Sequence, residues 1–170
     1  MSITITGGIS FSGGVGIVAP PPSVATAGWF AGGAGSAGEL SRVQRTTFAT
    51  DTATATIRGS LTAGRYGIGG TGTLTAAWFG GGYAPGGRVT TVERITYAND
   101  TAAASTRGPI TNAVRLLSSV GDNTYGWFAG GNAQISTVCR LIYATDTATA
   151  TDRGSLTAAN YSMGSSSGLQ

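Results

Sequence analysis

The sequence Gly28-Trp29-Phe30-Ala31-Gly32-Gly33 decides the fold of this chain, because it occurs three times. It returns as Ala77-Trp78-Phe79-Gly80-Gly81-Gly82, and again as Gly126-Trp127-Phe128-Ala129-Gly130-Gly131. The tryptophans are 49 residues apart in both steps. A fixed period of this length is the sequence signature of a repeat protein.

Two further blocks follow each Trp-Phe sequence. The first runs from an arginine to an aspartate six residues later: Arg45 to Asp51, Arg94 to Asp100 and Arg140 to Asp146. The second is an Arg-Gly pair that begins at Arg58, Arg107 and Arg153. Arg45 and Arg94 are 49 residues apart, but Arg94 and Arg140 only 46. Because length variation marks surface loops, we expect loops at 34–41, 83–90 and 132–136.

The chain divides into an arm and three repeats. Residues 1–27 hold isolated apolar residues among Gly and Ser, followed by Pro20-Pro21-Pro22, which favours a β-rich arm and a stiff linker. Residues 28–170 form the repeat domain, with repeats at 28–76, 77–125 and 126–170.

Each repeat is expected to hold about four short strands, which makes the fold class all-β. One strand is the Trp-Phe run, and the next alternates, as in 92–97. An Asp turn leads into a Thr-Ala strand, at 52–56, 101–105 and 147–151. The fourth runs back to the next Trp. Four strands in about 49 residues is the content of one propeller blade.

Composition excludes several classes of protein. Gly, Thr, Ala and Ser make up 96 of 170 residues, so a helical bundle is excluded. The chain has no His and no Lys, and Cys139 is its one cysteine. Catalysis by a Ser-His-Asp triad, His-ligated metals and intrachain disulfides are therefore absent. The ten arginines are dispersed, which does not predict nucleic-acid binding. Apolar runs are short, and neither a leader nor membrane insertion is predicted.

The double glycine after an aromatic strand, the pattern Val92-x-Arg94-x-x-Tyr97 and the following Asp turn resemble the kelch repeat of β-propellers. The resemblance covers residues 28–170. Unlike the family, the chain has its Trp before the double glycine and no aromatic in the Thr-Ala strands. The simple repeats behind an Ile-Thr-Ile-Thr leader also resemble structural proteins of tailed bacteriophages.

The repeated polar and aromatic residues are interpreted as structural. We expect Trp29, Trp78 and Trp127 to pack between repeats, with an aromatic carbohydrate-binding shelf as the alternative. Arg45, Arg94 and Arg140 are expected to pair with the aspartate at +6 or a backbone carbonyl, with an anionic ligand site as the alternative. The aspartates Asp51, Asp100 and Asp146 are interpreted as turn formers, and Arg58, Arg107 and Arg153 as the start of further turns.

Three further features complete the site predictions. Cys139 replaces Gln44 and Glu93 of the other repeats, which predicts a half-buried or solvent-facing thiol. Asp122 is expected to form a turn, since calcium-loop spacing is missing. No catalytic residue, metal or cofactor is predicted. Binding is instead expected at the variable loops, through Glu39, Tyr83, Pro85, Arg88, Asn132 and Gln134.

These features favour a non-enzymatic structural or adhesive protein of a tailed-phage virion: a fibre, a spike, or a capsid or tail decoration protein. It would be assembled in the host cytoplasm, bind another virion protein through residues 1–27, and display loops toward a host-surface glycan or protein. A cellular kelch-type protein-binding adaptor is the alternative, followed by a propeller glycosidase.

We also predict a homo-oligomer. Closed propellers use typically 4–8 blades, but this chain holds three repeats. The first Trp strand lacks the preceding strand that the others have, and 160–170 is a strand of that missing type. Exchange of this segment would give a dimer with six blades; a trimer around a threefold axis is the alternative.

Overall fold

Short runs of Trp, Phe, Val, Ile and Thr, bounded by glycines, form three antiparallel sheets. The computed structural model describes residues 24–132 and 134–167. The predicted arm therefore lies outside the described residues, except for residues 24–27. The all-β prediction is confirmed.

The sheets are numbered here in chain order. The first sheet holds β1 (Ala27–Ala31), β4 (Arg42–Thr47) and β5 (Thr56–Ser60). The second holds β6 (Gly69–Gly72), β7 (Ala76–Gly80), β10 (Val92–Thr96) and β11 (Ser105–Arg107). The third holds β12 (Ser118–Gly121), β13 (Tyr125–Ala129), β14 (Thr137–Ile142) and β15 (Thr151–Ser155).

The sheets are out of phase with the sequence repeats. In the second sheet, β6 comes from the end of one repeat and pairs with β7 of the next, and β12 pairs with β13 in the same way. Within the described residues, β1 pairs with β4 and has no partner on its other edge. In the part of the chain that the structure describes, the first sheet thus has no counterpart of the inner strands β6 and β12.

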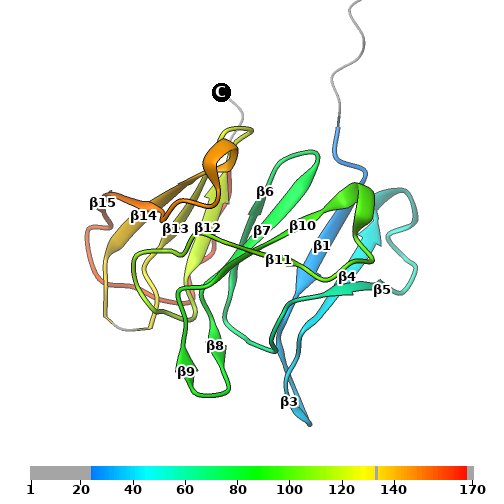
Figure 1. Cartoon of the computed structure of the whole chain (residues 1–170), viewed down its shortest axis with the longest axis horizontal. Helices are drawn as coiled ribbons and strands as arrows, with labels where there is room; N and C mark the ends of the chain where they lie inside the picture. The colour runs from blue at the N-terminus through cyan, green and yellow to red at the C-terminus, as the bar shows by residue number, and fades with distance from the viewer. Residues whose placement is uncertain (1–23, 133, 168–170) are drawn as a thin grey trace, which may run out of the picture.

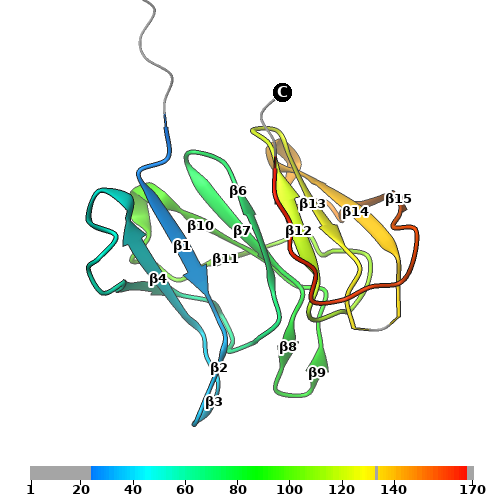
Figure 2. The same cartoon turned by 180° about the vertical axis from the view of Figure 1, so that it is seen from behind.

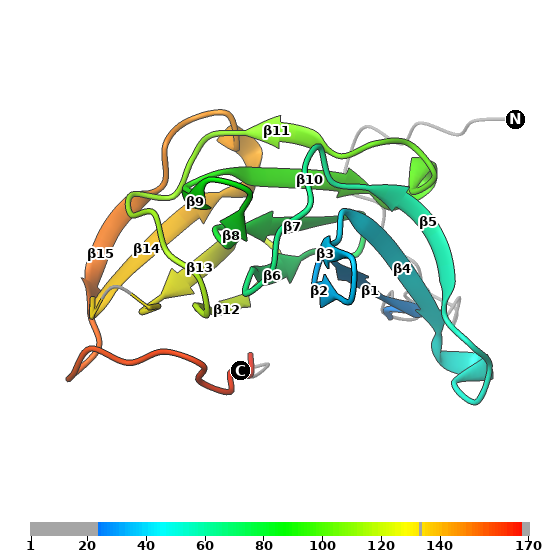
Figure 3. The same ribbon diagram turned by 90° about the horizontal axis from the view of Figure 1, so that it is seen from below.

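The three sheets lie side by side as an open arc (Figures 1 and 3). Viewed from below, the outer strands β5, β11 and β15 follow the rim of the arc, and β6 and β12 lie on its inner side (Figure 3). Two small hairpins, β2 (Ala34–Gly35) with β3 (Gly38–Glu39) and β8 (Tyr83–Ala84) with β9 (Gly87–Arg88), extend from the same end in both side views (Figures 1 and 2).

The double glycines direct the chain from each Trp-Phe strand toward these hairpins. Gly81 and Gly82 have φ values of 66° and 105°, a region that side chains with a Cβ disfavour. A Cβ on Gly81 would also lie 2.8 Å from the carbonyl oxygen of Val114. The repeat therefore requires glycine here for both conformation and space.

The predicted Thr-Ala strands are wrong in position. Short 3₁₀ turns follow β4, β10 and β14: η1 (Phe48–Thr50), η2 (Tyr97–Asn99) and η3 (Tyr143–Thr145). The Thr-Ala residues after them are mostly turn and coil, and the strands β5, β11 and β15 begin at their ends. Arg58, Arg107 and Arg153 consequently lie in strands and do not start turns. The side chains of Arg58 and Arg107 reach an aspartate of the next sheet.

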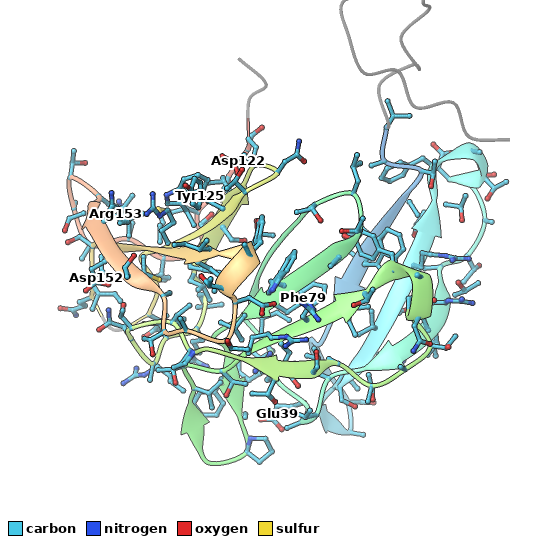
Figure 4. The ribbon with its side chains drawn as sticks, turned by 45° about the horizontal axis from the view of Figure 1, so that its top comes forward. Glu39, Phe79, Asp122, Tyr125, Asp152 and Arg153 are labelled. Carbon is cyan, nitrogen blue, oxygen red and sulfur yellow. The ribbon has the colours of Figure 1, made fainter. Side chains whose placement is uncertain are left out.

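The hydrophobic core lies between the sheets. One cluster joins the first and second sheets around Val43, Phe79 and Ile95. The other joins the second and third around Trp78, Val92 and Phe128. In each contact, the face of one sheet that carries its Trp packs against the Phe of the next sheet: Trp29 with Phe79, and Trp78 with Phe128. Figure 4 shows Phe79 in the interior of the molecule. We call the two contacts the first seam and the second seam.

Candidate functional site

An aspartate of one repeat binds three side chains of the preceding repeat at each seam. In the first seam, Asp100 Oδ2 accepts a hydrogen bond from Trp29 Nε1 at 3.1 Å. Its Oδ1 lies 2.7 Å from Arg58 Nη2, and its Oδ2 lies 3.5 Å from Arg45 Nη1. Asp100 is only 3% exposed.

The second seam repeats this geometry. Asp146 Oδ2 accepts from Trp78 Nε1 at 2.8 Å and lies 3.1 Å from Arg94 Nη1. Arg107 Nε is 3.3 Å from the same oxygen. The predicted pairing of each arginine with the aspartate six residues later is therefore wrong, because the partner is the aspartate of the following repeat. The carboxylates Asp100 and Asp146 also do more than form turns, since they join neighbouring sheets.

Charge compensation controls the ionisation of the Asp100 carboxyl. Burial works to raise its pKa, while hydrogen bonds from Arg58 and Trp29 and the charges of Arg58 and Arg45 lower it. The net effect holds the pKa of Asp100 below its ordinary value, so the ionised form is favoured in the folded state. The Asp100 group is a structural anion.

Aromatic stacking covers the tryptophans of the first and second seams, Trp29 and Trp78. The rings of Trp29 and Tyr97 stack with centroids 3.7 Å apart, and those of Trp78 and Tyr143 with centroids 4.1 Å apart. Burial, with a smaller contribution from Tyr143, raises the pKa of Tyr97 to about 12. Trp78 is 4% exposed, so its ring face does not offer a carbohydrate-binding shelf. Trp127 is half-buried on the outer face of the third sheet.

Sequence reasoning missed a buried ion pair in the first seam. Arg65 Nη2 lies 2.8 Å from Glu93 Oε2, with side chains that are 3% and 0% exposed. Glu93 Oε1 also accepts a hydrogen bond from the Thr62 amide at 2.8 Å. Burial lowers the pKa of Arg65, and the Glu93 charge opposes that effect. The sequence held a signal for this pair, because Glu93 alternates onto the same strand face as Ile95 and Tyr97.

The second seam has an apolar pair at the same positions. Counting 49 residues from Arg65 gives Val114, and 46 residues from Glu93 gives Cys139. Both are buried in the core cluster of the second seam, and Cys139 is 5% exposed. The predicted half-buried or solvent-facing thiol is therefore wrong. Burial raises the pKa of Cys139, which disfavours the reactive thiolate.

The exposed candidates for binding lie on the hairpins and the third loop, which we call the hairpin face (34–39, 83–88, 132 and 134–136). Pro85 and Arg88 are exposed, and Arg88 Nη1 donates to the carbonyl oxygen of Asn132 at 3.1 Å. Tyr83 is half-buried against Tyr66, and the Arg115 guanidinium lies over both rings. The second hairpin is thus anchored at its base and open at its tip.

The remaining candidates differ in exposure. Gln134 is exposed with a φ of 56°, whereas Glu39 and Asn132 are half-buried. Glu39 lies on the β2–β3 hairpin (Figure 4). The structure brings the second hairpin and the third loop into contact through Arg88 and Asn132.

Other features carry structural roles. Asp122 Oδ1 accepts hydrogen bonds from the amides of Thr124 and Tyr125 at 2.6 and 2.7 Å, which forms the predicted turn. Across residues 24–132 and 134–167, no three His, Cys, Asp or Glu side chains are grouped to hold a metal. A groove of about 800 Å³ is lined by Trp29, Arg45, Tyr97 and neighbouring small residues.

The part of the chain that the structure describes contains no helix of the length and apolarity needed to span a membrane. Comparison of the sequence with protein-family models and with curated proteins found no match to either.

Proposed function

We propose that this chain is a non-enzymatic structural or adhesive component of a tailed-phage particle, built from kelch-like propeller blades. It acts as a fibre, spike, or capsid or tail decoration protein. The observation that carries the proposal is that the repeated side chains join the sheets, whereas the variable segments lie on an exposed face. Side chains that recur in each repeat, Arg with Asp and Trp with Tyr, join one sheet to the next. The segments that differ in length or sequence between repeats form the hairpin face.

The arrangement of the two ends supports display. The hairpins extend from one end of the arc, and β1 begins at the opposite end (Figures 1 and 2). An arm that precedes β1 attaches to another virion protein from that side. The hairpin face then points away from the attachment, where a host-surface glycan or protein can reach it.

The carboxylates support a non-catalytic role. A glycosidase needs two carboxyl groups that flank the scissile bond. Asp100, Asp146 and Glu93 are instead buried against arginines that neutralise them. If these carboxylates were used for catalysis, they would have to leave their arginine partners, and the contacts between the sheets would be lost.

Particle purification tests the proposal. Phage particles from a culture that expresses the gene are banded on a density gradient and analysed by mass spectrometry. We expect the chain in the particle band, and we expect removal of residues 1–19 to abolish incorporation while the sheets remain folded. A variant with residues 84–87 replaced by Gly-Ser is the matched control, since it should incorporate normally. Recovery of the chain only in cell extract, bound to a cellular protein, would support the adaptor function instead.

A further inference from the structure

The outer face of the third sheet carries an apolar groove whose equivalent on the second sheet is filled by the core of the second seam. The groove, about 430 Å³, is lined by Trp127, Val138, Leu156 and Met163 with residues of β12 and the C-terminal segment. Counting back 46 residues from the last three, and 49 from Trp127, gives Val92, Ile110, Leu117 and Trp78. Those four residues lie in one core cluster with Phe128 of the next sheet. The groove is therefore a phenylalanine site without its phenylalanine.

The matching phenylalanine lies on the opposite end of the chain. Phe30 occupies the position of Phe79 and Phe128 in the repeat. Those two are 4% and 2% exposed, but Phe30 is 62% exposed. Ile57, on the neighbouring strand β5, is 63% exposed. The phenylalanine position is thus exposed in the first sheet, although it is buried in the other two sheets.

The polar groups of the two ends are complementary in the same way. Trp127, Arg140 and Arg153 stand where Trp78, Arg94 and Arg107 bind Asp146. Among the described residues, none of the three has a carboxylate partner. Figure 4 shows Arg153 at the outer edge of the third sheet.

The missing carboxylate is present on the first sheet. Asp51 has the position of Asp100 and Asp146, yet it is exposed and has no ion-pair partner among the described residues. Phe48, three residues earlier, has the position of Tyr97 and Tyr143 and is 53% exposed. In a third seam, Asp51 would accept from Trp127, Arg140 and Arg153, and Phe48 would stack on Trp127.

The residue pair that varies between seams also matches. The first seam holds Arg65 with Glu93, and the second holds Val114 with Cys139. The same positions at the open ends are Asn160 and Gln44. A third seam between the open ends would therefore hold an amide pair. Each side-chain amide can both donate and accept a hydrogen bond, so Asn160 and Gln44 are suitable partners.

The C-terminal segment supplies the missing inner strand. The Ser162 amide donates to the Leu116 carbonyl at 2.8 Å, as the Leu116 amide donates to the Gly67 carbonyl at 2.7 Å. Ser165 Oγ donates to the Ser119 carbonyl, as Ser119 Oγ donates to the Gly70 carbonyl. Residues 164–167 therefore lie beside β12 as β12 lies beside β6. They occupy the inner-strand position of a fourth sheet.

We propose that two copies of this chain close into a six-sheet ring through two identical third seams. In each seam, residues 164–167 of one copy pair with the open edge of β1 in the other copy. Phe30 of that second copy fills the apolar groove of the first, and its Asp51 binds Trp127, Arg140 and Arg153. A head-to-tail contact of this kind gives a ring when the rotation closes, and the arc of three sheets provides half of one (Figure 3). This inference deepens the proposed function, because a closed ring would display two copies of the hairpin face, and in that respect it rests on the proposed function.

Sedimentation equilibrium on the full chain tests the seam. We expect a mass about twice the 16.9 kDa of one chain. Asp51→Arg places a third positive charge beside Arg140 and Arg153, and should weaken the dimer by at least about 100-fold. Because Asp51 is exposed in the single chain, this variant should fold. Ala53→Arg, which adds a charge at another exposed residue of the same turn, is the control and should stay dimeric.

Cysteine cross-linking tests the strand exchange. Gly69 pairs with Gly80 and Ser118 with Ala129, so Gly164 should face Ala31 of the other copy. Directly paired strand residues lie within reach of a disulfide. A mixture of the single variants Ala31→Cys and Gly164→Cys should form a covalent dimer on mild oxidation, and neither variant should do so alone, because Cys139 is buried.

The outcomes separate the seam from the function. A wild-type mass of one chain, or of three, would overturn the six-sheet ring. A dimer that survives Asp51→Arg, or that gives no disulfide in the mixture, would place the interface elsewhere and leave oligomeric display intact. The particle experiment decides the virion role in either case.

Discussion

The Arg65–Glu93 ion pair can be replaced by the residues that the protein itself has at the same positions of its second seam. In the first seam the two charges lie 2.8 Å apart and are almost fully buried. In the second seam the same positions hold Val114 and Cys139. The double substitution Arg65→Val with Glu93→Cys therefore transfers the apolar pair of one seam into the other.

The magnitudes differ sharply between single and double variants. Removing one partner of a buried ion pair costs about 3–5 kcal/mol, because the other charge stays buried without compensation. This agrees with an attraction of about 4 kcal/mol for two charges about 4 Å apart at an effective dielectric constant of about 20. The double variant removes both charges together. Its main cost is unfilled volume: about 60 Å³ of cavity at about 24 cal/mol per Å³ gives about 1.5 kcal/mol.

A double-mutant cycle measures the result. The four proteins are unfolded in guanidinium chloride and followed by tryptophan fluorescence, at a concentration where all four have the same oligomeric state. We expect each single variant to lose about 3–5 kcal/mol and the double variant about 1–2 kcal/mol. The coupling energy should then be at least about 4 kcal/mol. A coupling energy below about 1 kcal/mol would refute the reasoning, because Arg65 and Glu93 would then contribute independently.

Three further predictions concern the seams and the hairpin face. Trp78→Ala should lower the free energy of unfolding by about 3–5 kcal/mol, because the ring is buried and stacked; a variant of unchanged stability that has lost glycan binding would instead support an aromatic shelf. The carboxylate of Asp100, whose pKa is lowered, stabilises the fold fully above the ordinary Asp value of about 4, and this stabilisation disappears as the pH falls through its lower folded-state pKa. Denaturant titrations between pH 7 and pH 2 should thus show a steeper loss of stability at acid pH for the wild type than for Asp100→Asn, and equal slopes would contradict the role of this group. Replacing residues 84–87 with Gly-Ser should change host adsorption and shift the free energy of unfolding by less than about 0.5 kcal/mol; a large loss of stability would show that the hairpin tip is not a free surface.

The repeat made much of the fold predictable. Three copies of a Trp-Phe-x-Gly-Gly sequence predicted three equivalent β units, and alternation in 92–97 predicted the strand that pairs with them. These are local signals, since β-branched and aromatic residues favour strands and paired glycines permit the positive φ of the turns. The length difference of three residues also indicated the loops that became the hairpin face.

The boundaries of the Thr-Ala strands were wrong for a local reason. Thr favours strands, but the aspartate before it ends a 3₁₀ turn and the chain continues as turn for several residues. The strands that contain the Arg-Gly sequences pair with β4, β10 and β14 instead, and Arg58 and Arg107 thereby reach the following repeat. Tertiary pairing there outweighed local propensity.

The sequence by itself determined the period, the strand type and the composition of each seam, because those follow from residues close together in the chain. Only the tertiary structure decided which partners meet. Arg45 lies six residues from Asp51 but binds Asp100, 55 residues away, since the two strands of one sheet point their arginines toward the next sheet. Cys139 is buried although its equivalents are polar, because the residue opposite it is Val114 and not Arg65. Such choices depend on the far side of a seam, which no local pattern contains.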